Sequence, residues 1–203
     1  MSRGRFVVFE GIDASGKSTQ ARRVAEDRGA RFTFEPGDTP LGADLRRWLL
    51  DASAPMSPVT ESLLMLADRS HHAATVIEPE LAAGRPVVSD RYWASSIAYQ
   101  GYGRGVDLAL LRAATELAIG ECQPDVTILL DVSVEVADER RRRDHRDRFE
   151  SADVAFHERV RAGYLELAAS DPAHWRVIDG SGNVETVSFA VESVLAETVW
   201  PGG

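Results

Sequence analysis

The sequence predicts an α/β fold built on a five-stranded parallel sheet with helices on both faces. Short β-prone segments alternate with segments of helical spacing along the 203 residues. Two β-prone segments, 86–90 and 126–131, are apolar along most of their length, as is typical of parallel strands buried on both faces. The stretch Gly11–Ser18 follows another such segment and matches the phosphate-binding pattern G-x-x-x-x-G-K-[ST].

Each element is expected from a local pattern. Phe6–Glu10 is short, apolar and β-prone, and helical spacing runs from Thr19 to Arg28 and ends at Gly29. The glycine-rich segment 101–105 is expected to join two helices. The further strands are expected at 31–34, 86–90, 126–131 and 175–179, and the further helices at 41–52, 58–83, 93–100, 107–120, 134–143, 153–170 and 183–199.

The loop Gly11–Ser18 brings together the groups that bind nucleotide phosphates. Gly11 and Gly16 permit a tight turn that points backbone N–H groups at phosphate oxygens, and the helix N-terminus adds partial positive charge. Lys17 is expected to bridge the β- and γ-phosphates, and the Ser18 hydroxyl to bind Mg²⁺. Lys17 is also the only lysine of the chain. The expected phosphate-binding residues are Gly11, Ala14, Ser15, Gly16, Lys17, Ser18 and Thr19.

Composition limits the class of protein. The chain has the length of one domain with a sizeable core, and its formal net charge of −9 disfavours a nucleic-acid polymer as partner. Cys122 is the single cysteine, so no intramolecular disulfide is expected. Neither an apolar leader segment nor a run of membrane-spanning length is present. We therefore expect a cytoplasmic, single-domain P-loop NTPase that binds small nucleotides and no membrane.

Three arginine-containing segments indicate a second anionic ligand. Arg91 follows a predicted strand and can grip a phosphate with two hydrogen bonds, while Asp90 can hold a magnesium-bound water; a strand-end ion pair would explain the same residues. Arg69 stands among apolar residues of a predicted helix, where a solvated arginine is the simpler interpretation. Segment 140–148 contains six arginines. We interpret it as a lid over transferring phosphates, although a solvated helix end has the same composition.

Together these segments resemble the thymidylate kinase family, from Arg5 to about Asp179. The most specific signal is Asp90-Arg91-Tyr92 followed by Ser95-Ser96 and Ala98-Tyr99-Gln100-Gly101, which a generic phosphate-loop protein would lack. The resemblance implies one nucleoside monophosphate kinase domain over 1–203, a homodimer, and transfer of the γ-phosphate of Mg·ATP to dTMP in dTTP synthesis. The other matching segments are 9–20, 35–37, 39–42, 67–69 with His72, 147–148 with Glu150, and Phe156 with 159–164.

The resemblance also implies roles for individual residues. Asp13 would lie near the phosphate and sugar of the acceptor, and Arg91 would grip that phosphate. Arg69 would donate to the thymine edge, and Tyr99 would pack against the deoxyribose. The implied acceptor-binding residues are Asp13, Glu35, Pro36, Met65, Arg69, Arg91, Ser96, Tyr99 and Gln100, the implied catalytic residues include Lys17, Asp13 and Arg91, and the expected magnesium site consists of Ser18 and Asp90.

Members of this family take a catalytic arginine from either the phosphate loop or the lid. Because the loop offers Ala14 and Ser15 here, the resemblance implies the lid type. The lid would span about 143–153, and its candidate catalytic residues are Arg143, Arg146 and Arg148. The loop at 179–182 would border the adenine of ATP.

Three positions depart from the usual family pattern on the acceptor side. Met65 stands where a phenylalanine usually stacks on thymine, and such stacking contributes about 1–3 kcal/mol per base. Phe34 replaces the usual arginine before Glu35, and Asp38 replaces a glycine and puts a carboxylate near the acceptor. These differences leave dUMP or a 5-modified dUMP as the alternative acceptor.

Other classes of nucleotide-binding protein are also considered. A GTP-hydrolysing switch would read guanine with an Asn-Lys-x-Asp segment, which is impossible because Lys17 is the only lysine. A small-molecule kinase of another family would share the phosphate loop but not the Tyr99-Gln100 stretch. A catalytically inactive nucleotide-binding protein is disfavoured by the presence of Lys17, Ser18 and Arg91.

Overall fold

The centre of the molecule is a five-stranded sheet, seen in a computed structural model that describes residues 3–51, 53–140 and 153–200. All neighbouring strands of the sheet run parallel, in the order β2-β3-β1-β4-β5. The predicted parallel sheet is therefore confirmed. Its strands are β1 (Phe6–Glu10), β2 (Arg31–Phe34), β3 (Val87–Asp90), β4 (Val126–Asp131) and β5 (Trp175–Asp179).

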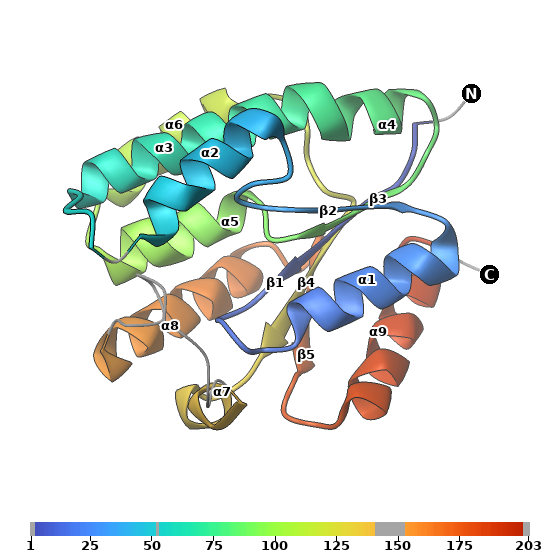
Figure 1. Cartoon of the computed structure of the whole chain (residues 1–203). Helices are drawn as coiled ribbons and strands as arrows, with labels where there is room; N and C mark the ends of the chain where they lie inside the picture. The colour runs from blue at the N-terminus through green and yellow to red at the C-terminus, as the bar shows by residue number, and fades with distance from the viewer. Residues whose placement is uncertain (1–2, 52, 141–152, 201–203) are drawn as a thin grey trace.

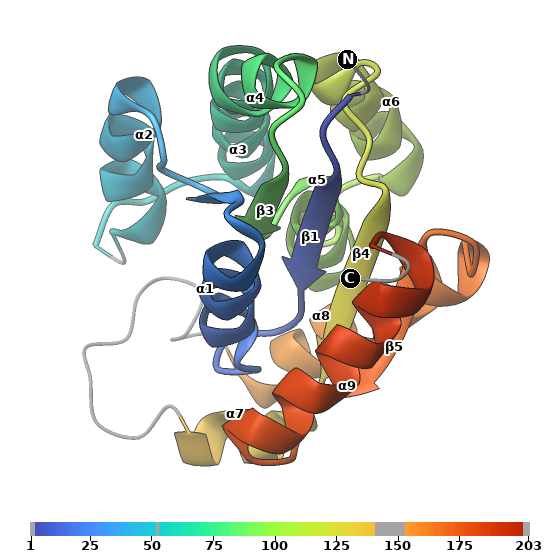
Figure 2. The same cartoon turned by 90° about the vertical axis from the view of Figure 1, so that its right-hand side faces the viewer.

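Helices cover both faces of the sheet (Figure 1). Figure 2 shows α1 (Lys17–Arg28) and α9 (Val184–Thr198) in front of the sheet. The opposite face is covered by α3 (Pro58–His72), α4 (Glu78–Ala82), α5 (Trp93–Ser96), α6 (Leu108–Ile119) and α8 (Val154–Ser170). Helix α2 (Pro40–Leu50) lies against α3, and α7 (Val134–Arg140) follows β4.

The alternation of side chains along β1 explains why the sheet needs both layers. Val7 and Phe9 are buried against α1 and α9, whereas Phe6 and Val8 are buried against the α3–α4 layer. Because consecutive strand residues point to opposite faces, a strand that is apolar throughout is stable only between two helical layers. The buried pattern of all five residues of β1 agrees with this requirement.

Two segments contain π-helical turns, which local spacing does not reveal. The expected helix at 58–83 is observed as α3, the π-helical turn η1 (Ala73–Ile77) and α4 in succession. The expected helix at 93–100 continues as η2 (Ile97–Gly103), so the first three residues of the glycine-rich segment are helical and the junction with the next helix is shortened to 104–107.

Close packing explains why glycine occupies this helical segment. A Cβ atom at Gly103 would lie 2.6 Å from the ring of Phe156, and one at Gly101 would lie 2.5 Å from the side chain of Leu108. The glycines therefore allow η2 to approach α6 and α8 closely.

Several helices begin one residue after the expected start, because a polar residue caps them. The side chains of Asp107, Asp153 and Asn183 each accept a hydrogen bond from a backbone N–H in the first turn of the helix that follows. In the part of the chain that the structure describes, no helix is long and apolar enough to cross a membrane.

Candidate active site

The carboxyl ends of β1 and β3 place two functional loops at one edge of the sheet. The phosphate loop connects β1 to α1, and Arg91 follows β3 directly. Within the phosphate loop, Gly11 and Gly16 have φ of 147° and 95°. A Cβ atom at Gly11 would lie 2.7 Å from the carbonyl oxygen of Leu130, so the backbone there tolerates only glycine. The loop thus reaches the N-terminus of α1 in a conformation suited to anion binding.

Lys17 is buried within the phosphate loop. Its Nζ donates to the backbone oxygen of Ile12 at 3.3 Å and lies 3.7 Å from Oδ1 of Asp13. Burial and the nearby charge of Arg91 lower the pKa of Lys17 below its ordinary value. A phosphate placed beside Nζ would offset both effects and favour the ammonium form.

Ser18, the last residue of the phosphate loop, and Asp90, the last residue of β3, form a small group of oxygen ligands. The Ser18 hydroxyl donates to Oδ2 of Asp90, and Oδ1 of Asp90 has no hydrogen-bond partner among the described residues. Hydroxyl and carboxylate oxygens are the ligands that Mg²⁺ prefers, so this pair fits the ion together with nucleotide phosphates. The described residues contain no cluster of three or more His, Cys, Asp or Glu side chains arranged to hold a metal. The phosphates would therefore provide an essential part of the coordination.

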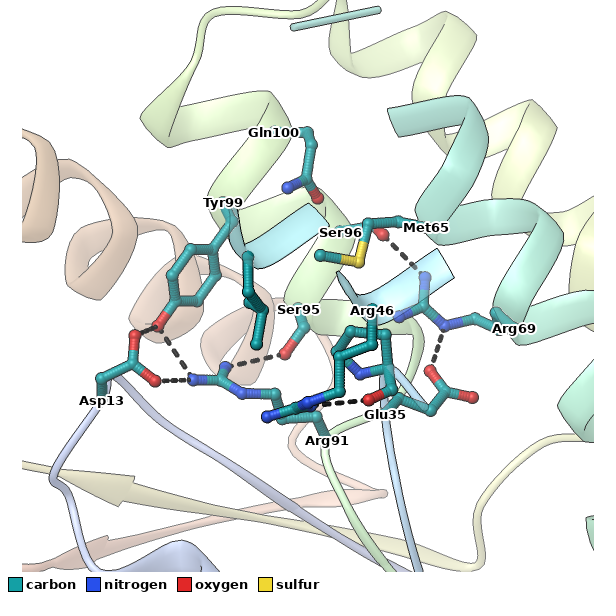
Figure 3. A pocket seen from close by; sticks show the side chains of 12 residues that line it. Asp13, Glu35, Arg46, Met65, Arg69, Arg91, Ser95, Ser96, Tyr99 and Gln100 are labelled. Carbon is teal, nitrogen blue, oxygen red and sulfur yellow. Dashed lines mark hydrogen bonds and ion pairs between the residues drawn. The ribbon is translucent and has the colours of Figure 1, made fainter. Parts of the chain in front are cut away.

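A cavity opens beside the phosphate loop and is shown in Figure 3. We call it the deep cavity. It lies between η2, α3 and the β2–α2 turn, and every residue of the implied acceptor-binding set lines it. The lining residues are Asp13, Glu35, Pro36, Arg46, Leu50, Met65, Arg69, Arg91, Ser95, Ser96, Tyr99 and Gln100.

Arg91 stands between the deep cavity and the phosphate loop. It has a φ of 75°, and its guanidinium donates to Asp13 and, at 3.0 Å, to the hydroxyl of Tyr99. The Tyr99 hydroxyl in turn donates to Asp13 at 2.8 Å. Burial opposes the ionised form of Asp13, but the charges of Arg91 and Lys17 outweigh it and hold the pKa of Asp13 far below its ordinary value.

Glu10, Ser95 and Tyr164 hold the other side of Arg91, a role that we did not assign to them from the sequence. Nη1 of Arg91 donates to the hydroxyls of Ser95 at 3.0 Å and Tyr164 at 3.1 Å. Both hydroxyls donate to Oε2 of Glu10, at 2.7 and 2.9 Å. Burial raises the pKa of Glu10. The signal available in the sequence was Glu10 itself, a carboxylate at the end of an otherwise apolar strand.

Arg69 lies at the far end of the deep cavity and is almost fully buried, which contradicts the simpler interpretation of a solvated arginine. Its Nε donates to Oε2 of Glu35 and its Nη1 to the hydroxyl of Ser96, both at 2.7 Å. Burial would raise the pKa of Glu35, but the charge of Arg69 and the hydrogen bond from His72 hold it below its ordinary value. Arg69 and Ser96 thus form one polar end wall (Figure 3).

The remaining wall of the deep cavity is mixed in character. Met65 brings its thioether against the cavity from α3, and Leu50 lines it from α2. Nε2 of Gln100 donates to Oε1 of Glu61 at 3.0 Å, which orients the amide. This wall can contact a flat ring on one side and a polar edge on another.

Arg46 is a lining residue that we did not predict. It comes from α2, donates to the backbone oxygen of Pro36 at 2.6 Å, and lies 5.7 Å from the ring centre of Phe34. Arg46 lines both the deep cavity and a second cavity that contains Lys17 and Ser18. The positive charge of Arg46 therefore lies near the ring of Phe34.

Asp38 does not line the deep cavity, contrary to the expectation that it puts a carboxylate near the acceptor. Its Oδ2 accepts hydrogen bonds from Arg31 at 2.8 Å and from the hydroxyl of Thr33 at 2.5 Å. Asp131 at the end of β4 is also used within the protein, since both of its oxygens accept from Arg161 at 2.7 and 2.8 Å.

A third cavity lies on the other side of the phosphate loop, next to the loop at 179–182. It includes Thr19 of the expected phosphate-binding set, and Arg140 at the end of α7 spans it. Arg140 donates to the backbone oxygens of Gly180 at 2.8 Å and Ser181 at 3.0 Å. The lid residues Arg143, Arg146 and Arg148 lie outside the described residues.

Comparison with known proteins agrees with this arrangement. A protein-family model described as thymidylate kinase matches residues 9–191. A thymidylate kinase of Nostoc sp. is 44% identical over 95% of this chain and 96% of its own length, and one of Cupriavidus metallidurans is 45% identical over 96% and 98%. The solved structure of thymidylate kinase from Ehrlichia chaffeensis superposes with a TM-score of 0.76 at 33% identity, covering 95% of this chain and 99% of that one.

Proposed function

The chain belongs to the thymidylate kinase family, and we propose that it transfers the γ-phosphate of ATP to dTMP, giving dTDP and ADP for dTTP synthesis. One observation carries the proposal: the deep cavity and the phosphate loop meet at Asp13 and Arg91, so two anionic ligands can be held face to face. No finding favours dUMP or a 5-modified dUMP over dTMP as the acceptor.

On the donor side, the phosphate loop and the third cavity would hold ATP. The backbone N–H groups from Gly11 to Thr19 would bind phosphate oxygens, and Lys17 would neutralise charge that develops on the transferred group. The adenine would lie in the third cavity between Arg140 and Val184. Mg²⁺ held by Ser18 and Asp90 would supply charge neutralisation to the ATP phosphates when bound.

On the acceptor side, Arg91 would hold the phosphate of dTMP in line with the γ-phosphate. A guanidinium can make two parallel hydrogen bonds to a phosphate, and Glu10, Ser95 and Tyr164 already fix its plane. In the reaction, an oxygen of the dTMP phosphate forms a bond to the γ-phosphorus as the bond to ADP breaks. The contribution of Arg91 and Asp13 is thus positioning, which is what phosphoryl transfer chiefly requires.

The base of dTMP would occupy the far end of the deep cavity. Arg69, Ser96 and Gln100 would hydrogen-bond its polar edge, and Met65 would lie against its ring. Tyr99 would face the sugar, and Glu35 with Pro36 would close the side next to β2. Buried polar groups that need a ligand to complete their hydrogen bonds discriminate strongly between bases.

The lid, the oligomeric state and the location complete the proposal. Arg143, Arg146 and Arg148 would approach the transferring phosphate from a lid at about 143–153 of a single domain spanning 1–203. We also propose a homodimer, supported by exposed apolar side chains on the adjoining helices α2, α3 and α6, namely Trp48, Val59, Leu63, Leu110 and Leu117. A cytoplasmic location is consistent with a single, buried cysteine.

The decisive experiment measures ADP release from Mg·ATP by the purified protein against dTMP, dUMP, 5-hydroxymethyl-dUMP, dCMP, dGMP, AMP, UMP and CMP. We expect dTMP to have the highest kcat/KM, and the Lys17→Ala variant to lose activity with every acceptor. Preference for another deoxynucleotide would leave the phosphoryl transfer in place and refute dTMP as the acceptor. Unaltered turnover in Lys17→Ala would refute the assignment of the phosphate loop.

A further inference from the structure

A continuous chain of polar contacts connects the exposed edge of β2 to the end wall of the deep cavity. Thr33 and His72 lie at its middle and are fully buried, so neither has water as an alternative partner. None of the roles assigned above uses these two residues. The contacts run from Arg31 through Asp38, Thr33, His72, Glu35 and Arg69 to Ser96.

The two contacts of the Thr33 hydroxyl indicate which of these polar groups carry protons. Its Oγ1 lies 2.5 Å from Oδ2 of Asp38 and also 2.5 Å from Nε2 of His72. The hydroxyl has a single proton, and a carboxylate paired with Arg31 can only accept a hydrogen bond. The Thr33 proton must therefore point to Asp38, and Nε2 of His72 must itself carry a proton that it donates to Thr33.

The other nitrogen of His72 faces a second carboxylate. Nδ1 lies 2.8 Å from Oε1 of Glu35, and Oε2 of Glu35 accepts from Nε of Arg69 at 2.7 Å. A carboxylate bound to a guanidinium is an acceptor only, so Nδ1 must also carry a proton. Neutral imidazole has one ring proton, and both contacts together need two.

We propose that His72 is an imidazolium held between Glu35 and the Thr33–Asp38 pair, and that it acts as a positioning residue for Arg69 in the acceptor site. The inference deepens the proposed function and rests on it for the role of Arg69. The state of His72 itself follows from the contacts alone.

The charges around His72 are consistent with this state. Asp38 and Glu35 face it from β2 and the turn after it, while Asp68 and Arg69 come from its own helix, α3. Three carboxyl groups therefore surround one guanidinium at this place, and the charge of Arg31 lies beyond Asp38. A cation at His72 balances the cluster, which a buried site of low polarity requires.

The consequence for the site lies in the orientation of Arg69. His72 binds Oε1 of Glu35, and Nε of Arg69 donates to Oε2, so Glu35 is held between the two side chains. This fixes the guanidinium so that Nη1 reaches Ser96 at the cavity wall. If Nε2 of His72 lost its proton, the Thr33 hydroxyl would donate to that nitrogen, and its hydrogen bond to Asp38 would break.

The test uses ¹⁵N NMR of the histidine side chains in the full-length protein at pH 7, with the signal of His72 assigned by His72→Gln. We expect both ring nitrogens of His72 to be protonated in the wild type. In Asp38→Ala, the Thr33 hydroxyl is free to donate to Nε2, so the spectrum should change to a neutral imidazole with its proton on Nδ1. Asp44→Ala is the matched control, because Asp44 is an exposed carboxylate outside the chain of contacts.

Kinetics then test the positioning role. In Asp38→Ala the neutral imidazole keeps its Nδ1–H contact to Glu35 but loses the charge that strengthens it, so Glu35 holds Arg69 less firmly. The KM for dTMP should therefore rise by about three- to tenfold while kcat and the KM for ATP stay unchanged. Thr33→Val removes the same link without touching a charge and should act alike, which covers the case that Asp38→Ala does not fold. A neutral His72 in the wild type, or a doubly protonated His72 in both variants, would overturn the inference. If the NMR result holds and no dTMP kinase activity exists, the proposed function fails and the imidazolium stands.

Discussion

Arg91 shows how much of this site depends on single side chains held from several sides. It follows β3 with a left-handed backbone, and its guanidinium is bound by groups from the phosphate loop, α5, η2 and α8. The backbone conformation is uncommon for a residue with a Cβ atom and is maintained by these contacts. A guanidinium fixed in advance loses little freedom when it binds a phosphate.

The Arg91→Ala variant should therefore raise the KM for dTMP by a factor of about 10–100, with ATP binding little changed. Initial rates and calorimetric titration with ATP measure the two effects separately. Arg47→Ala serves as the control, because Arg47 is exposed on α2 and pairs only with Asp44 in the described contacts. An equal loss of ATP affinity would contradict the assignment of Arg91 to the acceptor site.

Met65 provides a test of where the base lies. Substitution by phenylalanine would present an aromatic ring from α3 to the deep cavity. If the base lies against residue 65, Met65→Phe should lower the Kd for dTMP by a factor of about three to ten, since stacking contributes about 1–3 kcal/mol and Met already recovers part of it. Calorimetry measures this Kd, and an unchanged value would refute the position given to the base.

Asp68 makes the stability of the protein depend on pH. Burial, with the nearby charge of Glu35, raises its pKa from 3.8 to about 6. The folded state therefore holds the proton more tightly than the unfolded state, and stability falls as the pH rises from about 4 through 6. An asparagine in place of Asp68 would stay neutral at every pH, and its side-chain oxygen could still accept the hydrogen bond from the backbone of Gly37.

Asp68→Asn should thus be more stable than the wild type at pH 7 by up to about 2–3 kcal/mol, with little difference at pH 4. Urea denaturation at both pH values measures the two differences. Asp44→Asn, which changes an exposed carboxylate, should change the free energy of unfolding by the same amount at both pH values. A constant offset for Asp68→Asn would contradict the raised pKa.

At the scale of elements, the approach of α2 to α3 depends on Gly42. A Cβ atom at this position would lie 2.2 Å from Oδ1 of Asp68 and 3.1 Å from Cα of Gly37. Neither neighbour can move freely, because Asp68 is a short buried side chain and Gly37 is backbone. Helix α2 also carries Arg46 and Leu50 to the deep cavity, so its position affects the site.

Gly42→Ala should destabilise the fold by about 2 kcal/mol despite the better helix propensity of alanine. It should also raise the KM for dTMP more than that for ATP, because α2 brings both Arg46 and Leu50 to the deep cavity, whereas only Arg46 reaches the cavity that contains Lys17. Thermal unfolding and initial rates are the measurements. Ala43→Gly, at a neighbouring position of the same helix, isolates the contribution of helix propensity, and a stabilised Gly42→Ala variant would contradict the close contact.

At the scale of the whole molecule, large apolar side chains remain exposed on one helical layer. Leu63 of α3 is 61% exposed and Leu117 of α6 is 87% exposed, and α3 contacts α6 directly. An apolar surface of this kind is typical of an interface between protein subunits. The layer adjoins the deep cavity through α3, so association would also support the acceptor site.

The double variant Leu63→Arg/Leu117→Arg should therefore be monomeric, whereas the wild type should be a dimer in light scattering after size-exclusion chromatography. Phe189→Arg is the control, since Phe189 is 77% exposed on α9 at the other face of the sheet. It should leave the dimer intact. A monomeric wild-type protein would refute the proposed homodimer.

Much of the fold could be predicted because each element carries its own pattern. The strands, the phosphate loop and the helix after it follow from apolar runs, glycines and a lysine at fixed spacing. The π-helical turn η2 could not be predicted in the same way. Its glycines have the composition of a loop, and they are helical because Phe156 and Leu108, which come later in the chain, lie against them.

The sequence by itself determined the order of the elements, the phosphate loop and most residues that line the deep cavity. Only the tertiary structure decided that Arg69 is buried, that Arg46 reaches the cavity, and that Asp38 turns away from it to Thr33. The physical reason is the range of the interactions. Strand and helix patterns reflect neighbours a few residues apart, whereas the partners of a side chain in the site come from elements whose crossing depends on the packing of the whole core.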